Sequence, residues 1–182
     1  MANALTAVRL ALVVPMAAGL ARPDLLAPGI VALVLCVAIA TDYLDGPVAR
    51  RMGTASMTGQ LFDHSTDCLF VTGGLTGAAI AGAVTPMLPA VIPFAFAQYV
   101  VDSYVWHRQR QLRASFLGRW NGVLYFVPLV LIAAARLSFP AGFTSFLRLA
   151  AGVLGYLLAA STVASIIDRA TTPFRSHEQI AQ

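Results

Sequence analysis

Residues 42–67 read DYLDGPVARRMGTASMTGQLFDHSTD and contain four of the eight acidic residues of this 182-residue chain. Asp42 and Asp45 are three residues apart, and Asp63 and Asp67 are four apart. Both pairs interrupt long apolar runs, where an isolated carboxylate is energetically costly. Such residues are usually kept because they bind something, so we expect this stretch to join two helices and to carry the functional site.

The composition around this stretch is that of a membrane protein. Hydrophobic residues make up 58% of the chain and charged residues 11%, whereas charged residues make up about 25% of a typical soluble domain. An apolar segment of about 20 residues is long enough to cross a bilayer as a helix. We therefore predict an all-α integral membrane protein, a single membrane domain over residues 1–182. Its six transmembrane helices are expected at residues 5–21, 27–48, 61–84, 87–107, 119–138 and 143–167.

The arginines predict how these helices are oriented. All twelve basic residues are Arg, and short loops between the segments make neighbouring helices antiparallel. If the N-terminus is cytoplasmic, nine arginines, Arg9 among them, fall on the cytoplasmic side and only Arg22, Arg136 and Arg148 fall outside. Cytoplasmic loops are normally enriched in basic residues. We therefore expect both termini in the cytoplasm, the inner (cytoplasmic) membrane as location, and anionic lipid headgroups rather than nucleic acid as partners.

The two acidic pairs are predicted to meet. Residues three or four apart share a helix face, and the pairs lie in the last turns of segment 27–48 and the first turns of segment 61–84. The site is thus expected between the second and third helices at the cytoplasmic face. Four carboxylates in a low dielectric require either protons or divalent cations. Oxygen ligands suit Mg²⁺, Mn²⁺ or Ca²⁺, and Mg²⁺ often shares its coordination with a substrate phosphate.

The residues next to the acids predict room for a nucleotide or diphosphate. Gly46 and Ala49 remove side-chain bulk on one helix, and Gly59 does so on the other. Arg50 would lie at the rim, where a guanidinium pairs well with phosphate.

The order Asp42-x-x-Asp45-Gly46-x-x-Ala49-Arg50, eight residues, Gly59-x-x-x-Asp63-x-x-x-Asp67 resembles the signature of the CDP-alcohol phosphotransferase (phosphatidyltransferase) family, class I. The six-helix layout and the start Asn3-x-x-Thr6-x-x-Arg9 also resemble that family. Its members are integral membrane enzymes, commonly homodimers, in which a second alcohol displaces CMP from a CDP-linked alcohol.

The resemblance implies a role for each matching residue. Asp42, Asp45 and Asp63 would hold Mg²⁺ or Mn²⁺, as a centre of two ions that Asp67 also joins. Asp67 would in addition be the base that activates the acceptor hydroxyl. The CDP-binding residues would be Gly46, Ala49, Arg50, Gly59 and Asp42, with Asn3 and Thr6 in the same pocket.

The acceptor alcohol is left open. Gln98 and Asp102 lie one turn apart in segment 87–107, and polar residues within a span indicate a cavity. Arg113 and Arg119 are further candidates for binding an acceptor phosphate. Family members with a glycerophosphate acceptor typically have Arg at the position of Gln98 and a basic residue at that of Cys68, whereas residues 61–67, LFDHSTD, are similar to choline and ethanolamine phosphotransferases.

The sequence leaves two enzymatic activities and one non-enzymatic class of protein as alternatives. The leading prediction is displacement of CMP from CDP-diacylglycerol by a polar alcohol, and the alternative is an aminoalcohol phosphotransferase that uses CDP-choline or CDP-ethanolamine and diacylglycerol. A non-catalytic cation-binding or transport protein is the other class. Transporters often contain inverted repeats with a midplane site, whereas here the acids lie at one face and the pattern has no second copy.

Two further features predict packing. The third segment contains a stripe of small residues, Gly73, Gly74, Gly77, Ala78 and Gly82. Such a stripe lets helices approach closely, either within the bundle or across a dimer. Trp120 and Tyr125 are expected in the aromatic belt at the membrane interface.

Overall fold

The computed structural model describes residues 2–51, 57–101 and 116–178, and all the regular structure in these ranges is helical. The all-α prediction is therefore confirmed. The helices are α1 (Ala2–Ala21), α2 (Pro28–Arg51), α3 (Met57–Ile80), α4 (Met87–Val101), α5 (Phe116–Leu124), α6 (Phe126–Ala135) and α7 (Ala141–Glu178).

The protein is an integral membrane protein. Within the described residues, four apolar stretches are long enough to cross a membrane, namely Ala4–Ala21, Pro28–Asp45, Gly118–Ala135 and Ala141–Ala170. Their outer faces are apolar too, since Val14 is 73% exposed and Leu149 is 67% exposed. Large apolar surfaces of this kind are rare in soluble monomers and suit contact with lipid.

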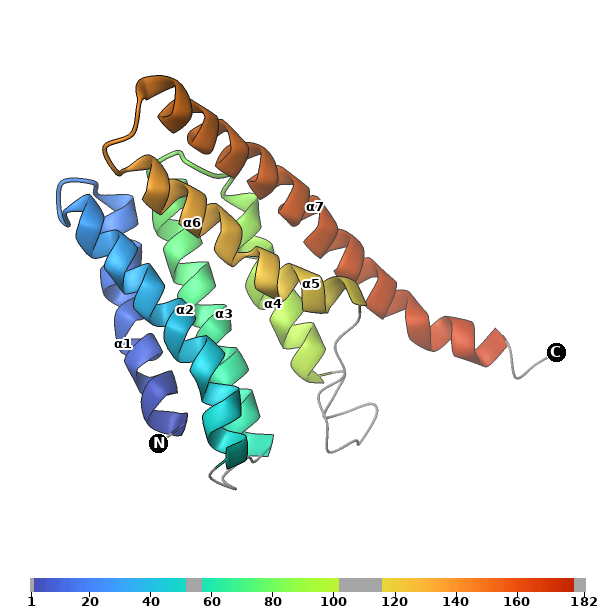
Figure 1. The fold of residues 1–182 in the computed structure, drawn as a ribbon. Helices are drawn as coiled ribbons and strands as arrows, with labels where there is room; N and C mark the ends of the chain where they lie inside the picture. Colours follow the sequence, from blue (N-terminus) through green and yellow to red (C-terminus); the bar gives the residue numbers. More distant parts are fainter. Residues whose placement is uncertain (1, 52–56, 102–115, 179–182) are drawn as a thin grey trace.

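The helices form two groups that share one bundle (Figure 1). Helix α1 packs closely against both α2 and α3, while α7 lies along α4, α5 and α6. The N-terminus, the end of α2 and the beginning of α3 lie together at one end of the bundle. The close backbone contacts in this region are made by α1 with its two neighbours, more than by α2 with α3. A site built there therefore includes α1, which carries Asn3 and Thr6 of the predicted CDP pocket as well as Arg9.

The predicted helix at residues 119–138 is divided into α5 and α6 at Tyr125. Pro128 accounts for the division, because a proline cannot donate to the carbonyl four residues before it and its ring crowds that carbonyl. Tyr125 itself keeps right-handed helical angles, with φ −62° and ψ −24°. The chain direction is thus largely preserved, and Gly118–Ala135 remains one stretch of membrane-crossing length.

The other helix ends differ from prediction in both directions. Helix α3 ends at Ile80 instead of residue 84, because Gly82 adopts a φ of +72°. The Gly82 N–H donates to Ala79 O at 3.0 Å and the Ala83 N–H to Ala78 O at 2.9 Å, which is the glycine-dependent Schellman termination of a helix.

Several other helix ends extend beyond the predicted ranges, and one end is not described. Helix α1 begins at residue 2 rather than 5, α3 at 57 rather than 61 and α5 at 116 rather than 119. Helix α2 ends at 51 rather than 48, and α7 runs from 141 to 178 rather than from 143 to 167. The predicted end of the fourth helix at residue 107 lies outside the described residues.

The small-residue stripe of α3 packs inside the bundle against α1. A Cβ atom added at Gly73 would lie 2.9 Å from Val13 Cγ1, and one added at Gly77 would collide with the carbonyl oxygen of Ala17. The two helices therefore approach so closely that only hydrogen fits at Gly77. These glycines serve the packing of α1 on α3. They therefore do not identify an interface for the predicted homodimer.

Candidate active site

The four aspartates of the sequence pattern converge on one guanidinium group, that of Arg9. Its Nη1 atom lies 3.3 Å from Asp42 Oδ1 and 3.1 Å from Asp63 Oδ1, and it also contacts Asp67 Oδ1. Its Nη2 atom lies 3.3 Å from Asp45 Oδ2. The Arg9 side chain is 0% exposed. Four carboxylates from α2 and α3 thus surround one buried cation from α1.

Asp45 is the most enclosed of these acids. Its side chain is 5% exposed, against 39% for Asp42 and 24% for both Asp63 and Asp67. The Thr6 hydroxyl donates to Asp45 Oδ2 at 2.7 Å. The other carboxylate oxygen, Oδ1, is buried and has no hydrogen-bond partner among the described residues. A buried carboxylate oxygen without a donor is costly, and it marks an unused ligand position in the cluster.

Arg9 corrects the prediction that only protons or divalent cations could accompany the four carboxylates. The chain supplies a cation of its own, because Arg9 is buried among these acids. Its sequence signal was a single Arg inside an otherwise apolar helix, one turn from Thr6. A charge in that position indicates a buried partner, but the partner cannot be named until α2 and α3 are placed.

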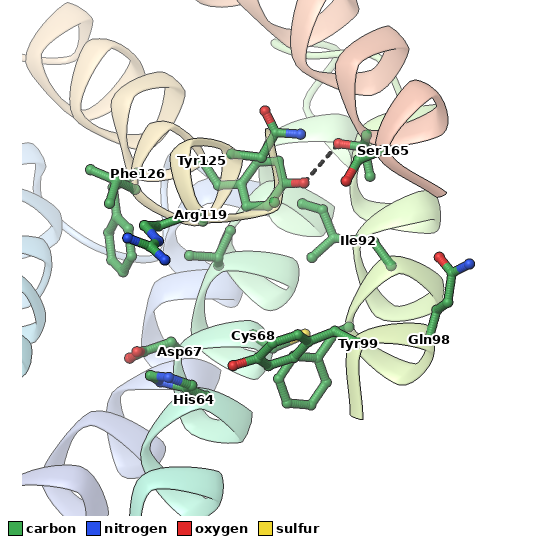
Figure 2. Close-up of a pocket in the computed structure, with 18 of the residues that line it drawn as sticks. His64, Asp67, Cys68, Ile92, Gln98, Tyr99, Arg119, Tyr125, Phe126 and Ser165 are labelled. Carbon is green, nitrogen blue, oxygen red and sulfur yellow. Dashed lines mark hydrogen bonds between the residues drawn. The ribbon is translucent and has the colours of Figure 1, made fainter. Parts of the chain in front are cut away.

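A cavity of about 510 Å³ opens beside the acids. Asp42, Asp63 and Asp67 line it, and its other walls come from α4, α5, α6 and α7. Figure 2 shows His64 and Asp67 on one side of the cavity and Arg119 and Tyr125 on the other. The acids therefore face a partly open volume large enough for part of a ligand, with the polar side chains of Arg119 and Tyr125 opposite them.

Two of the four predicted acceptor-binding residues line this cavity, Gln98 and Arg119. The Gln98 side chain donates through Nε2 to the carbonyl oxygen of Ile166 at 3.0 Å, so it also ties α4 to α7. Asp102 and Arg113 lie outside the described residues.

Four polar cavity residues on α5 and α7 were missed, Asn121, Thr162, Ser165 and Arg169. The Tyr125 and Thr162 hydroxyls share a hydrogen bond of 2.7 Å, and Tyr125 is only 8% exposed. Its assignment to the aromatic belt is therefore wrong, whereas Trp120 is 55% exposed. Small polar residues in an apolar helix were the available signal, and the fold was needed to bring them to one cavity.

The predicted CDP-binding residues are only partly described. Thr6 and Asp42 lie in the cluster, and Gly59 lies in the first turn of α3. The side chains of Asn3, Ala49 and Arg50, and the surroundings of Gly46, lie outside the described residues. The backbone of α2 does continue past Asp45 through Gly46, Ala49 and Arg50 in helical form, so these residues lie on the same helix as the acids.

The donor set fits a divalent cation. It consists of carboxylate oxygens, which are hard ligands, and it includes the unpartnered Asp45 Oδ1. One ligand atom each from Asp63, His64 and Asp67 also lie within 4.8 Å of one another. The His64 Nδ1 atom lies 3.9 Å from Asp63 Oδ2, which makes His64 a further candidate ligand.

Comparisons with known proteins agree with this geometry. A family model described as CDP-alcohol phosphatidyltransferase matches residues 1–167. A CDP-diacylglycerol–glycerol-3-phosphate 3-phosphatidyltransferase of Mycoplasma genitalium is 31% identical over 96 residues, which are 51% of this chain and 40% of that protein. The match thus spans about two fifths of the relative's length. No solved structure shows significant similarity to this chain.

Proposed function

The chain belongs to the CDP-alcohol phosphatidyltransferase family, and we propose that it transfers the phosphatidyl group of CDP-diacylglycerol to a polar alcohol with release of CMP. The observation that carries this proposal is the convergence of Asp42, Asp45, Asp63 and Asp67 beside a cavity. The membrane-crossing helices support a lipid-linked donor. The relative named for CDP-diacylglycerol supports the same donor, so CDP-choline and CDP-ethanolamine are not favoured.

The four aspartates are proposed to hold Mg²⁺ or Mn²⁺, as two ions. Bound there, the ions would neutralise the diphosphate and make CMP a better leaving group. His64 is a further candidate ligand on the cavity side. Gly46, Ala49, Arg50 and Gly59 are proposed to line the CDP site, together with Asn3 and Thr6.

The reaction is proposed to be a single displacement. The acceptor hydroxyl oxygen forms a bond to the phosphorus that carries diacylglycerol, the bond from that phosphorus to CMP breaks, and CMP leaves with the electron pair. Asp67 is proposed to take the hydroxyl proton, the role that the resemblance to the family implies for it, and its side chain lines the cavity. No covalent phosphoenzyme is required.

For the acceptor we propose a phosphorylated polyol, with glycerol 3-phosphate as the first to test. Arg119 and Arg169 line the same cavity as the acids, and a guanidinium is well suited to phosphate. Gln98 and Asn121 add amide groups that can hydrogen-bond to hydroxyls. Asp102 and Arg113 stay predictions.

The cellular setting is also proposed. The enzyme would lie in the cytoplasmic membrane as a homodimer, with six transmembrane helices, the acidic cluster at the cytoplasmic face and both termini in the cytoplasm. The excess of arginine on that side supports this orientation.

The test is CMP release by the detergent-purified protein with Mg²⁺. CDP-diacylglycerol, CDP-choline and CDP-ethanolamine should be compared as donors, with glycerol 3-phosphate, inositol 1-phosphate, inositol, serine and glycerol as acceptors. We expect release from CDP-diacylglycerol that depends on a phosphorylated polyol. Release that depends on serine, or on a CDP-aminoalcohol with diacylglycerol, would overturn the substrate proposal and keep the family.

A further inference from the structure

We propose that Arg9 is an exchangeable counter-ion. Its guanidinium offsets part of the negative charge of the four aspartates before a divalent cation binds, and it withdraws from them when the cation takes its place. This inference rests on the proposed function, because it takes the aspartates as metal ligands. It goes beyond that function by giving the active site two stable states. In one state Arg9 is the partner of the aspartates, and in the other the divalent cation is.

The position of the guanidinium is the first argument. One nitrogen, Nη1, contacts Asp42, Asp63 and Asp67 together, at 3.3 Å for the first and 3.1 Å for the second. A metal ion shared by these carboxylates would need oxygen atoms from the same three side chains, at about 2.1 Å in the case of Mg²⁺. The Nη1 atom therefore occupies the point at which the ligands converge, and the two cations exclude each other there.

Charge is the second argument. Four carboxylates surround one guanidinium, so the cluster stays strongly negative with Arg9 in place. A divalent cation adds more charge at the same point, and it repels the guanidinium when both lie within a few ångströms. Binding of the cation therefore both replaces the attraction that holds Arg9 and pushes Arg9 away.

The incomplete bonding of Arg9 is the third argument. Its Nε atom is buried and has no hydrogen-bond partner among the described residues. Its Nη2 contact with Asp45 Oδ2 is long, at 3.3 Å, and Asp45 Oδ1 is left without a donor. A guanidinium that was built only to anchor the fold would be expected to use its planar set of donors fully. Arg9 Nε and Asp45 Oδ1 are instead available to a different partner.

Arg136 is the matched control, because it is held by groups that no cation replaces. Its Nη2 atom donates to the carbonyl oxygens of Pro23 at 2.8 Å and Leu26 at 3.2 Å, and its Nη1 atom donates to Gly19 O. None of these partners is an acid. Loss of Arg136 should therefore affect stability to the same extent with and without a divalent cation.

The experiment is thermal unfolding of the purified wild type and the Arg9→Gln and Arg136→Gln variants, each in EDTA and in saturating Mg²⁺. Mn²⁺ affinity is measured in parallel from the electron paramagnetic resonance of the free ion. We expect Arg9→Gln to lower Tm in EDTA and to lose most of that difference in Mg²⁺. Because a competing cation has been removed, it should bind Mn²⁺ about tenfold more tightly than the wild type.

Other results would overturn the inference. An equal loss of Tm in EDTA and Mg²⁺ with unchanged Mn²⁺ affinity would make Arg9 a structural anchor like Arg136. Weaker Mn²⁺ binding in Arg9→Gln would make it a residue that positions the aspartates for the metal. If Arg9→Gln does not fold, Arg9→Lys replaces it. Lys keeps the charge but not the fork, so we expect tighter Mn²⁺ binding than in the wild type, and weaker binding would contradict the exchange.

A failure of the proposed function would look different. In that case the wild type would gain no stability from Mg²⁺ and would bind no Mn²⁺, whatever Arg9→Gln does. Stabilisation of the wild type together with an equal loss in both conditions rejects only the exchange of Arg9.

Discussion

The two ends of helix α1 are each fixed by an arginine, but the groups around these arginines differ. Near the N-terminus, Arg9 lies among four carboxylates and beside a cavity. Near the C-terminus, the backbone of α1 at Gly19 accepts a hydrogen bond from Arg136, which also binds two loop carbonyls. Carbonyl groups are neutral and belong to the fold, whereas an excess of carboxylates attracts further cations. The difference separates an end built for chemistry from an end built for stability.

The strongest test of the aspartate cluster around Arg9 is the variant Asp67→Asn. The change keeps the size of the side chain and removes the proposed base, and general base catalysis contributes about 10²- to 10⁴-fold. We expect CMP release to fall by at least about a hundredfold while Mn²⁺ is still bound. Asp24→Asn, at an exposed aspartate between α1 and α2, is the control and should keep full activity. Retained activity in Asp67→Asn would rule out Asp67 as the base.

The strongest test of packing near the C-terminal end of α1 is the variant Gly77→Ala in α3. A Cβ atom at this position would meet the α1 backbone at Ala17, with 3.1 Å to its Cα atom, so α1 must move away from α3. Overpacking of this kind costs about 3 kcal/mol at the upper end of its usual range. Tm should fall equally in EDTA and Mg²⁺. Gly142→Ala, where no atom lies within 4 Å, should leave Tm unchanged or raise it, and equal Tm in both variants would refute the close approach.

Arg136→Gln tests the carbonyl contacts themselves. The shorter side chain cannot reach the acceptors on Gly19, Pro23 and Leu26 together. Lost hydrogen bonds from a charged donor should lower the free energy of unfolding by about 2 kcal/mol. Arg148→Gln, at an exposed arginine of α7, controls for loss of a positive charge. If both variants unfold at the wild-type temperature, Arg136 does not hold this end of α1.

The smallest expected effect belongs to Thr6→Val. The change keeps the shape and removes the hydroxyl that donates to Asp45 Oδ2 at 2.7 Å, at a cost of about 1 kcal/mol. A small decrease in Tm in EDTA is expected. Thr76→Val removes a hydroxyl that bonds only to the Thr72 carbonyl of its own helix and should change Tm less. A larger decrease for Thr76→Val would mean that Asp45 does not depend on Thr6.

The apolar segments and the acidic pattern could be predicted because both are local. Segment length and composition are enough to predict a membrane helix, and the spacing of Asp42, Asp45, Asp63 and Asp67 is enough to place each pair on one helix face. The four carboxylates do lie together in the structure.

The parts that were missed depend on residues far apart in the chain. Arg9 meets Asp67, 58 positions later, so its role required the packing of α1 against α3. Tyr125 reads as an interfacial aromatic residue, and only the position of α7 shows that Thr162 binds its hydroxyl. The division of the fifth predicted helix could have been foreseen, because Pro128 acts on the carbonyl four residues before it.

We propose that the four aspartates of α2 and α3, near the N-terminal end of α1, form a divalent-cation-dependent site that releases CMP. The most direct measurement is CMP release from CDP-diacylglycerol and glycerol 3-phosphate by the purified protein, first in EDTA and then with Mg²⁺ or Mn²⁺ restored. We expect no CMP release in EDTA, recovery of CMP release on addition of either ion, and no recovery in Asp67→Asn. Acceptor-dependent CMP release that continues undiminished in EDTA, or that survives in Asp67→Asn, would contradict it.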